Sequence, residues 1–136
     1  EDAPGALWKP DQVDLHRVTE APAMVRIVIA VDPSVSASSE SAETGIIGAG
    51  LGVDGHGYVL SDDSLKQPTP EQWGSQSVVA YRKLQADGVV GEVNNGGDLV
   101  ESNVKAIDRN IPLCGCRHQY FGRSGRGSGL AFATAR

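Results

Sequence analysis

The chain has 136 residues, of which 40% are hydrophobic and 21% are charged. This length suits a single domain, and the composition excludes a disordered or fibrous chain. No apolar run reaches the roughly 18 residues that a membrane-spanning helix needs, and the acidic start before Pro4 and Gly5 does not match a signal peptide. We therefore expect a soluble intracellular protein.

Charge is unevenly distributed along the sequence. Residues 1–110 contain 17 acidic and 8 basic residues, a balance of −9, whereas residues 111–136 contain 4 Arg and no carboxylate, a balance of +4. Affinity for nucleic-acid phosphates comes mostly from Lys and Arg, so the acidic body is by itself a poor nucleic-acid binder. Its carboxylates can still hold a divalent cation.

The first half of the sequence predicts a lead-in segment followed by three strands. Residues 1–22 contain only a short helical pattern, from Asp11 to Val18. The run Met24–Asp32 is β-branched and almost continuously apolar, which is typical of a central strand covered on both faces. A serine-rich stretch, residues 33–42, predicts a mobile loop. Two further strands, Thr44–Val53 and one starting with Tyr58–Leu60, form an antiparallel hairpin around the glycine-containing turn of residues 54–57.

The second half predicts two helices separated by a short buried strand. Thr69, Glu71 and Gln72 around Pro70 form a capping-box pattern, so a helix begins at Pro70 and extends to Ala86. The strand Gly88–Val93 and a helix from about Asp98 to Ile107 follow. The order β-β-β-α-β-α predicts an α/β fold, a mixed sheet with helices packed on it. From Leu113 to Gly129 the amphipathic period is lost, and we expect little packed structure there.

Asp32 and Glu92 are the candidate metal ligands and catalytic residues. Each ends or nearly ends a strand that is otherwise apolar, and α/β sheets place ligand sites at the carboxyl ends of their strands. Mg²⁺ prefers oxygen ligands and is commonly held by one or two carboxylates. Taken singly, Asp32 can instead begin the Asp-Pro turn, and Glu92 can point to solvent from an edge strand.

Other polar groups carry weaker signals. Glu43 can face Asp32 across the hairpin, although an acid beside a serine-rich loop is more often just solvated. The turn of residues 94–98 offers backbone amides for phosphate, while Asp98 can simply cap the following helix. Cys114, Cys116 and His118 lack a fourth ligand for a zinc site. The sequence contains no P-loop.

Several segments, taken in order and spacing, resemble the nuclease part of the phage large terminase subunit. They are GALW at residues 5–8, RIVIAVDPS at 26–34, ETGI at 43–46, DGHGYVL at 54–60, PEQW at 70–73 and EVNNGGD at 92–98. The similarity covers roughly residues 3–112. In that family a P-loop ATPase precedes an RNase H-like nuclease that cuts concatemeric phage DNA with divalent metal ions.

The resemblance implies roles for this sequence. Asp32 and Glu92 correspond to two of the acidic ligands for Mg²⁺ or Mn²⁺, which would activate a water and stabilise the leaving 3′ oxygen of a phosphodiester. Double-stranded DNA is the implied substrate. In the family, the portal and the small terminase subunit are the protein partners, there is no membrane, and the bacterial host cytoplasm is the location.

The sequence departs from the family at its start and after Pro112. Residues 1–22 are interpreted as a lead-in from a missing ATPase domain, residues 23–112 as a partial RNase H-like nuclease domain, and residues 113–136 as an atypical, disordered tail. We expect the fold to be incomplete at the C-terminus because a further strand, a helix and the third acidic ligand have no counterpart. A reading-frame change in a prophage gene would explain the tail. The chain is then expected to be inactive; the alternatives are a noncatalytic prophage remnant or interaction module, or another RNase H-like nuclease such as a resolvase.

Overall fold

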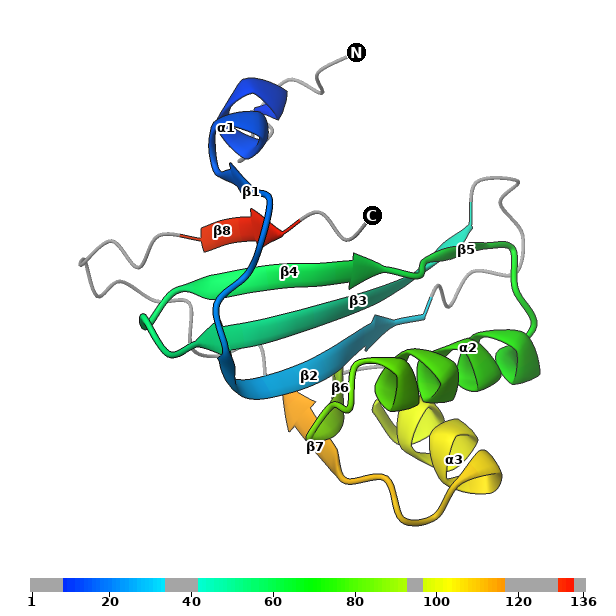
Figure 1. Cartoon of the computed structure of the whole chain (residues 1–136). Coiled ribbons are helices and arrows are strands. Elements are labelled where there is room, and N and C mark those ends of the chain that lie inside the picture. Colours follow the sequence, from blue (N-terminus) through cyan, green and yellow to red (C-terminus); the bar gives the residue numbers. More distant parts are fainter. Residues whose placement is uncertain (1–8, 34–41, 93–96, 117–129, 134–136) are drawn as a thin grey trace.

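The computed structural model describes residues 9–33, 42–92, 97–116 and 130–133. These residues form one eight-stranded sheet with two helices packed on it and a short helix near the N-terminus (Figure 1). The elements are α1 (Pro10–Leu15), β1 (Arg17–Val18), β2 (Met24–Asp32), β3 (Glu43–Gly52), β4 (Gly57–Asp62), β5 (Leu65–Lys66), α2 (Pro70–Lys83), β6 (Gly88–Glu92), α3 (Gly97–Ile107), β7 (Leu113–Cys116) and β8 (Leu130–Ala133).

The sheet is mixed, with strand order β1-β8-β4-β3-β2-β6-β7, and β5 also pairs with β3. Strands β2, β3 and β4 are successive antiparallel neighbours, whereas β6 runs parallel to β2 and β7 runs parallel to β6. Strands β2–β4 thus form an antiparallel meander, which β6 and β7 extend as parallel strands beyond β2. The predicted α/β class and mixed sheet are confirmed, while the order β-β-β-α-β-α gains β5 before α2 and a further strand, β7, after α3, neither of which was expected from the sequence.

The hydrophobic core lies between one face of the sheet and helices α2 and α3. Alternate residues of the central strands, Ile29 and Val31 of β2 and Ile46 of β3, are almost completely buried in it. Trp73 of α2 and Val100 of α3 pack against them from the helices. This alternation, which the pleat of a strand imposes, leaves the intervening residues on the opposite face. Figure 1 shows both helices on the same side of the sheet.

The predicted capping box begins α2 as expected. The Thr69 hydroxyl accepts a hydrogen bond from the Gln72 amide at 3.2 Å, and the Gln72 side chain accepts one from the Thr69 amide at 2.8 Å. The helix ends at Lys83, three residues before the expected end at Ala86. Gln85, with φ of 51°, turns the chain toward β6. Its left-handed backbone ends the helix early although the apolar period continues to Ala86.

The chain after Pro112 contains strands that the sequence did not predict. The expectation of little packed structure is wrong for Leu113–Cys116, which pairs with β6 from Val89 to Glu92. Leu113 is partly buried against the core, and the Pro112 carbonyl accepts a hydrogen bond from the Val89 amide at 2.9 Å. Pairing with an open strand edge uses backbone groups, so it does not require an amphipathic side-chain period. A second strand, β8, pairs with β4 and β1.

Two predicted segments fall largely outside the described residues. They are the serine-rich loop, of which residues 34–41 are not described, and the tail between β7 and β8, residues 117–129. In the described ranges of the chain, no helix has the length and apolar character needed to cross a membrane.

Candidate functional site

Asp32 and Glu92 are the last residues of two neighbouring parallel strands. Asp32 ends β2 and Glu92 ends β6, and the register aligns Val31 with Gly91, one position earlier on each strand. The two backbones therefore end side by side at the same edge of the sheet. The role of Asp32 and Glu92 as metal ligands stays a prediction. The side chain of Glu92 lies outside what the structure describes.

Asp32 lies on the sheet face opposite α2 and α3. Its neighbour Val31 is 3% exposed and belongs to the core, whereas Asp32 is exposed to solvent. Across the antiparallel pair, Asp32 faces Gly45 of β3. Because alternate residues of a strand point to opposite faces, the carboxylate of Asp32 is directed away from the helices.

The Asp32 carboxylate has no hydrogen-bond or ion-pair partner among the residues that the structure describes. An exposed carboxylate without a basic neighbour keeps its oxygens available for a hard cation such as Mg²⁺, which favours such ligands. Within the described part of the chain, no three His, Cys, Asp or Glu side chains gather as a metal-binding group. Among the described side chains, Asp32 is thus a single candidate carboxylate ligand rather than a complete metal site.

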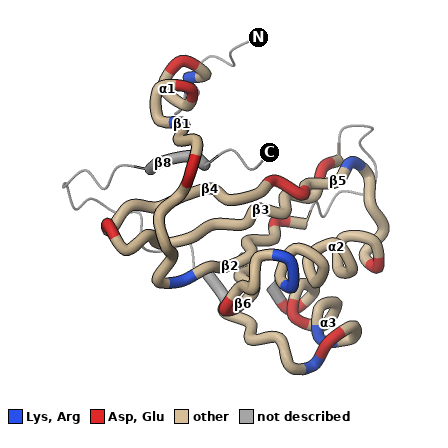
Figure 2. The backbone as a smooth tube through the Cα atoms, in the orientation of Figure 1, with Lys and Arg blue, Asp and Glu red and all other residues tan. Residues whose placement is uncertain are grey.

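Glu43 lies close to this edge of the sheet, as the sequence suggested, although its pairing differs. It stands two residues before Gly45 on β3, so it shares the face of Asp32, and its direct cross-strand partner is Lys66 of β5. Glu43 is exposed. Figure 2 shows acidic segments together with a basic one around β5. The local charge is therefore mixed rather than purely acidic.

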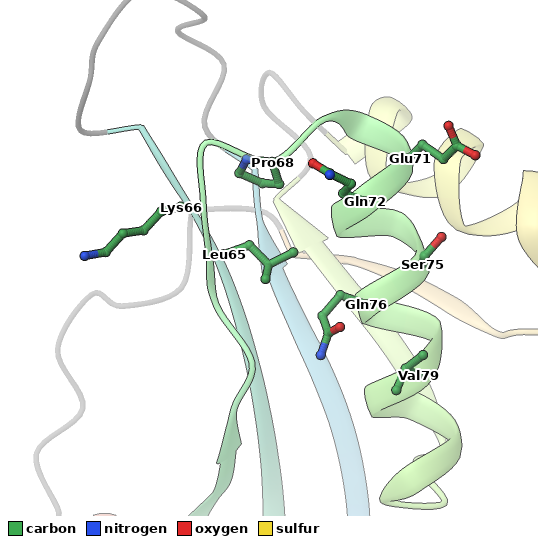
Figure 3. A pocket seen from close by; sticks show the side chains of 8 residues that line it. All are labelled: Leu65, Lys66, Pro68, Glu71, Gln72, Ser75, Gln76 and Val79. Carbon is green, nitrogen blue, oxygen red and sulfur yellow. The ribbon is translucent and has the colours of Figure 1, made fainter.

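A groove of about 570 Å³ lies between β5 and α2, and Lys66 of β5 is among the residues that line it. Figure 3 shows that Leu65, Gln72 and Gln76 turn into it, while Lys66 extends away from the helix. Leu65 packs on the core with its cross-strand partner Thr44, which is 3% exposed. The pairing of Lys66 with Glu43 and the view in Figure 3 agree that the Lys66 side chain lies on the open face of the sheet, the face opposite α2 and α3.

The remaining sequence candidates are only partly described. Residues 93–96 of the predicted phosphate-binding turn and His118 lie outside the described residues. Cys114 is an exposed free thiol, and Cys116 takes the register position beside Glu92 on β7. Asp98 lies in the first turn of α3, where a carboxylate interacts favourably with the helix dipole.

Carboxylates with shifted pKa values lie away from this edge and support local structure. The Tyr58 hydroxyl donates a hydrogen bond to the Asp54 carboxylate at 2.6 Å. This hydrogen bond is the main cause of the lowered pKa of Asp54 and of the raised pKa of Tyr58. The Asn110 amide, followed by the Arg82 guanidinium, lowers the pKa of Asp108. Asp54 stabilises the β3–β4 turn, and Asp108 the end of α3.

Comparisons with known proteins give structural matches alone. No protein-family model and no curated protein sequence matches the chain. Among solved structures, T. thermophilus RuvC in complex with Holliday junction substrate aligns at TM-score 0.46 and 12% identity, covering 67% of this chain and 65% of that one. Fowlpox virus resolvase in complex with substrate Holliday junction DNA aligns at TM-score 0.45 and 10% identity, covering 72% and 64%. The chain thus spans slightly less than two thirds of each.

Proposed function

We propose that the chain is the RNase H-like nuclease region of a phage or prophage terminase large subunit, with Asp32 and Glu92 as ligands of a divalent cation. The observation that carries the proposal is the pair of carboxylate residues that end adjacent, paired parallel strands. The exposure of Asp32 and its lack of a basic partner among the described residues also support it.

Asp32 and Glu92 would hold Mg²⁺ or Mn²⁺ through carboxylate oxygens, and Mn²⁺ would bind more tightly. The bound cation would act as a Lewis acid on a phosphodiester and lower the pKa of a bound water. Two-metal hydrolysis needs both cations to be fixed relative to the scissile phosphate, and two carboxylates constrain a second ion poorly. We therefore propose that the chain binds a cation but cleaves DNA slowly or not at all.

Isothermal titration calorimetry with Mn²⁺ tests the metal site. Asp32→Asn and Glu92→Gln should each weaken Mn²⁺ binding by about tenfold or more, since each removes one of two anionic ligands. Asp11→Asn in α1 makes the same charge change at an exposed position in another element and should leave binding unchanged. Equal affinity in the wild type and Asp32→Asn would refute the proposed site.

Cleavage assays test whether the site is catalytically complete and whether it prefers a junction. We expect little conversion of supercoiled plasmid by the wild-type chain with Mn²⁺. Strong cleavage that Asp32→Asn or Glu92→Gln abolishes would show that the site is catalytically complete. Selective cutting of a four-way junction over linear duplex would assign the chain to the resolvases. Normal Mn²⁺ binding without cleavage of either substrate is the expected result.

A further inference from the structure

Gly45 is a glycine whose missing side chain the packing of the described residues does not explain. A Cβ atom added there would meet the Asp32 Cβ at 3.8 Å, an ordinary van der Waals contact, and nothing closer. Gly45 has no positive φ. By contrast, a Cβ on Gly88 would lie 3.1 Å from the Pro112 carbonyl oxygen, and one on Gly91 would lie 3.0 Å from Val100. Glycine weakens a strand, and it often marks a bulge, a tight bend, or a site that a ligand or another backbone approaches closely.

The open position at Gly45 is directly beside Asp32. The two residues are opposite each other in the β2–β3 register and share the face that lacks α2 and α3. A side chain at position 45 would therefore stand next to the exposed Asp32 carboxylate. Within the described residues, its absence leaves a path along the sheet surface to that carboxylate.

Lys66 supplies a positive charge on the same face. It is exposed, it is directly opposite Glu43, and it extends away from α2 (Figure 3). No ion pair of Lys66, with Glu43 or any other acid, occurs within the described ranges. With about 4.8 Å between strands and about 3.3 Å per residue, the Cα atoms of Lys66 and Asp32 lie roughly 12 Å apart, which one nucleic-acid strand can span.

We propose that a DNA strand reaches Asp32 across Gly45, with Lys66 contacting a phosphate of its backbone. The inference rests on the proposed metal site, because the cation must offset the charges of Asp32 and Glu43 before a polyanion can approach. Lys66 adds sequence-independent attraction by displacing counterions. The missing side chain at position 45 lets the sugar-phosphate backbone lie close to the sheet, as a phosphodiester must if it is to share a cation with Asp32.

Fluorescence anisotropy of a short labelled DNA duplex, in Ca²⁺ to avoid turnover, tests the proposal on the full chain. Gly45→Val should weaken the metal-dependent DNA binding by about tenfold. The added side chain would keep the phosphodiester away from the cation at Asp32, and tenfold is the scale of losing one charge-assisted contact. Lys66→Ala should reduce the slope of log K against log salt by about one. Matched controls on the same face are Ala49→Val on β3 and Arg26→Ala on β2, the latter roughly 20 Å from Asp32 along the strand, and both should bind like the wild type.

Two further measurements keep the outcomes distinct. Calorimetry with Mn²⁺ should show unchanged affinity in Gly45→Val and Lys66→Ala, and thermal unfolding should show that both variants fold. If Asp32→Asn loses Mn²⁺ but Gly45→Val and Lys66→Ala bind DNA like the wild type, the path is refuted and the metal site stands. Absence of metal-dependent DNA binding in the wild type also overturns the path. If Asp32→Asn keeps full Mn²⁺ affinity, the metal site fails, and the path fails with it.

Discussion

Gly91 of β6 and Val100 of α3 form a tight contact immediately before the candidate ligand Glu92. Val100 is 0% exposed, and a Cβ atom added to Gly91 would lie 3.0 Å from its Cβ and 3.1 and 3.2 Å from its two methyl carbons. A β-branched side chain in a helix has one preferred rotamer and cannot turn away from such a contact. Gly91→Ala must therefore shift α3 relative to β6, at a cost of about 1–3 kcal/mol in the free energy of unfolding.

A double-mutant cycle isolates this contact. Val100→Ala removes two buried methyl groups, worth about 1.6 kcal/mol in transfer free energy, and leaves a cavity that raises the loss to about 2–3 kcal/mol. It also removes two of the three atoms that the new Cβ would meet. The double variant should thus be about 1 kcal/mol more stable than the sum of the single changes.

Equilibrium unfolding in urea measures the free energy of unfolding of the wild type, the two single variants and the double variant. Gly45→Ala is the matched control, because the added Cβ finds space and alanine replaces glycine in a strand, so it should stabilise the protein by about 0.5–1 kcal/mol. The reasoning is refuted if Gly91→Ala is as harmless as Gly45→Ala. It is equally refuted if the Gly91 and Val100 changes add within about 0.5 kcal/mol.

Two other changes test the helix ends. Thr69→Ala should lower the free energy of unfolding by about 1 kcal/mol, because the backbone amide of Gln72 at the start of α2 loses its acceptor. Thr69→Ser keeps the hydroxyl and should be close to the wild type. Equal losses of stability for the two variants in urea unfolding would contradict the capping role. Asp108→Asn should lower the melting temperature at neutral pH, since the lowered pKa of Asp108 means that its carboxylate stabilises the fold above the unfolded-state pKa. That stabilisation is lost as the pH falls through the folded-state pKa, so the melting temperatures of the wild type and Asp108→Asn should converge in acid. A difference between them that does not change with pH would show that the charge of Asp108 is not the cause.

The sequence by itself determined most of the central architecture. The apolar run of β2, the glycine turn before β4 and the capping box of α2 are local signals, and the structure has each element where they indicated. Local signals are reliable here because turn geometry, helix capping and burial periodicity depend on residues close together in the chain. The positions of Asp32 and Glu92 at the ends of apolar strands were visible in the same way.

Only the tertiary structure decided which residues surround those carboxylates. The neighbours of Asp32 on the open face, Gly45 and Lys66, follow from strand register, and the pairing of β5 with β3 has no signal in so short a segment. The strand β7 was missed because its pairing depends on an open backbone edge of β6 rather than on its own side-chain pattern. Register and edge pairing bring together residues distant in sequence, so they depend on the whole sheet and not on any one segment.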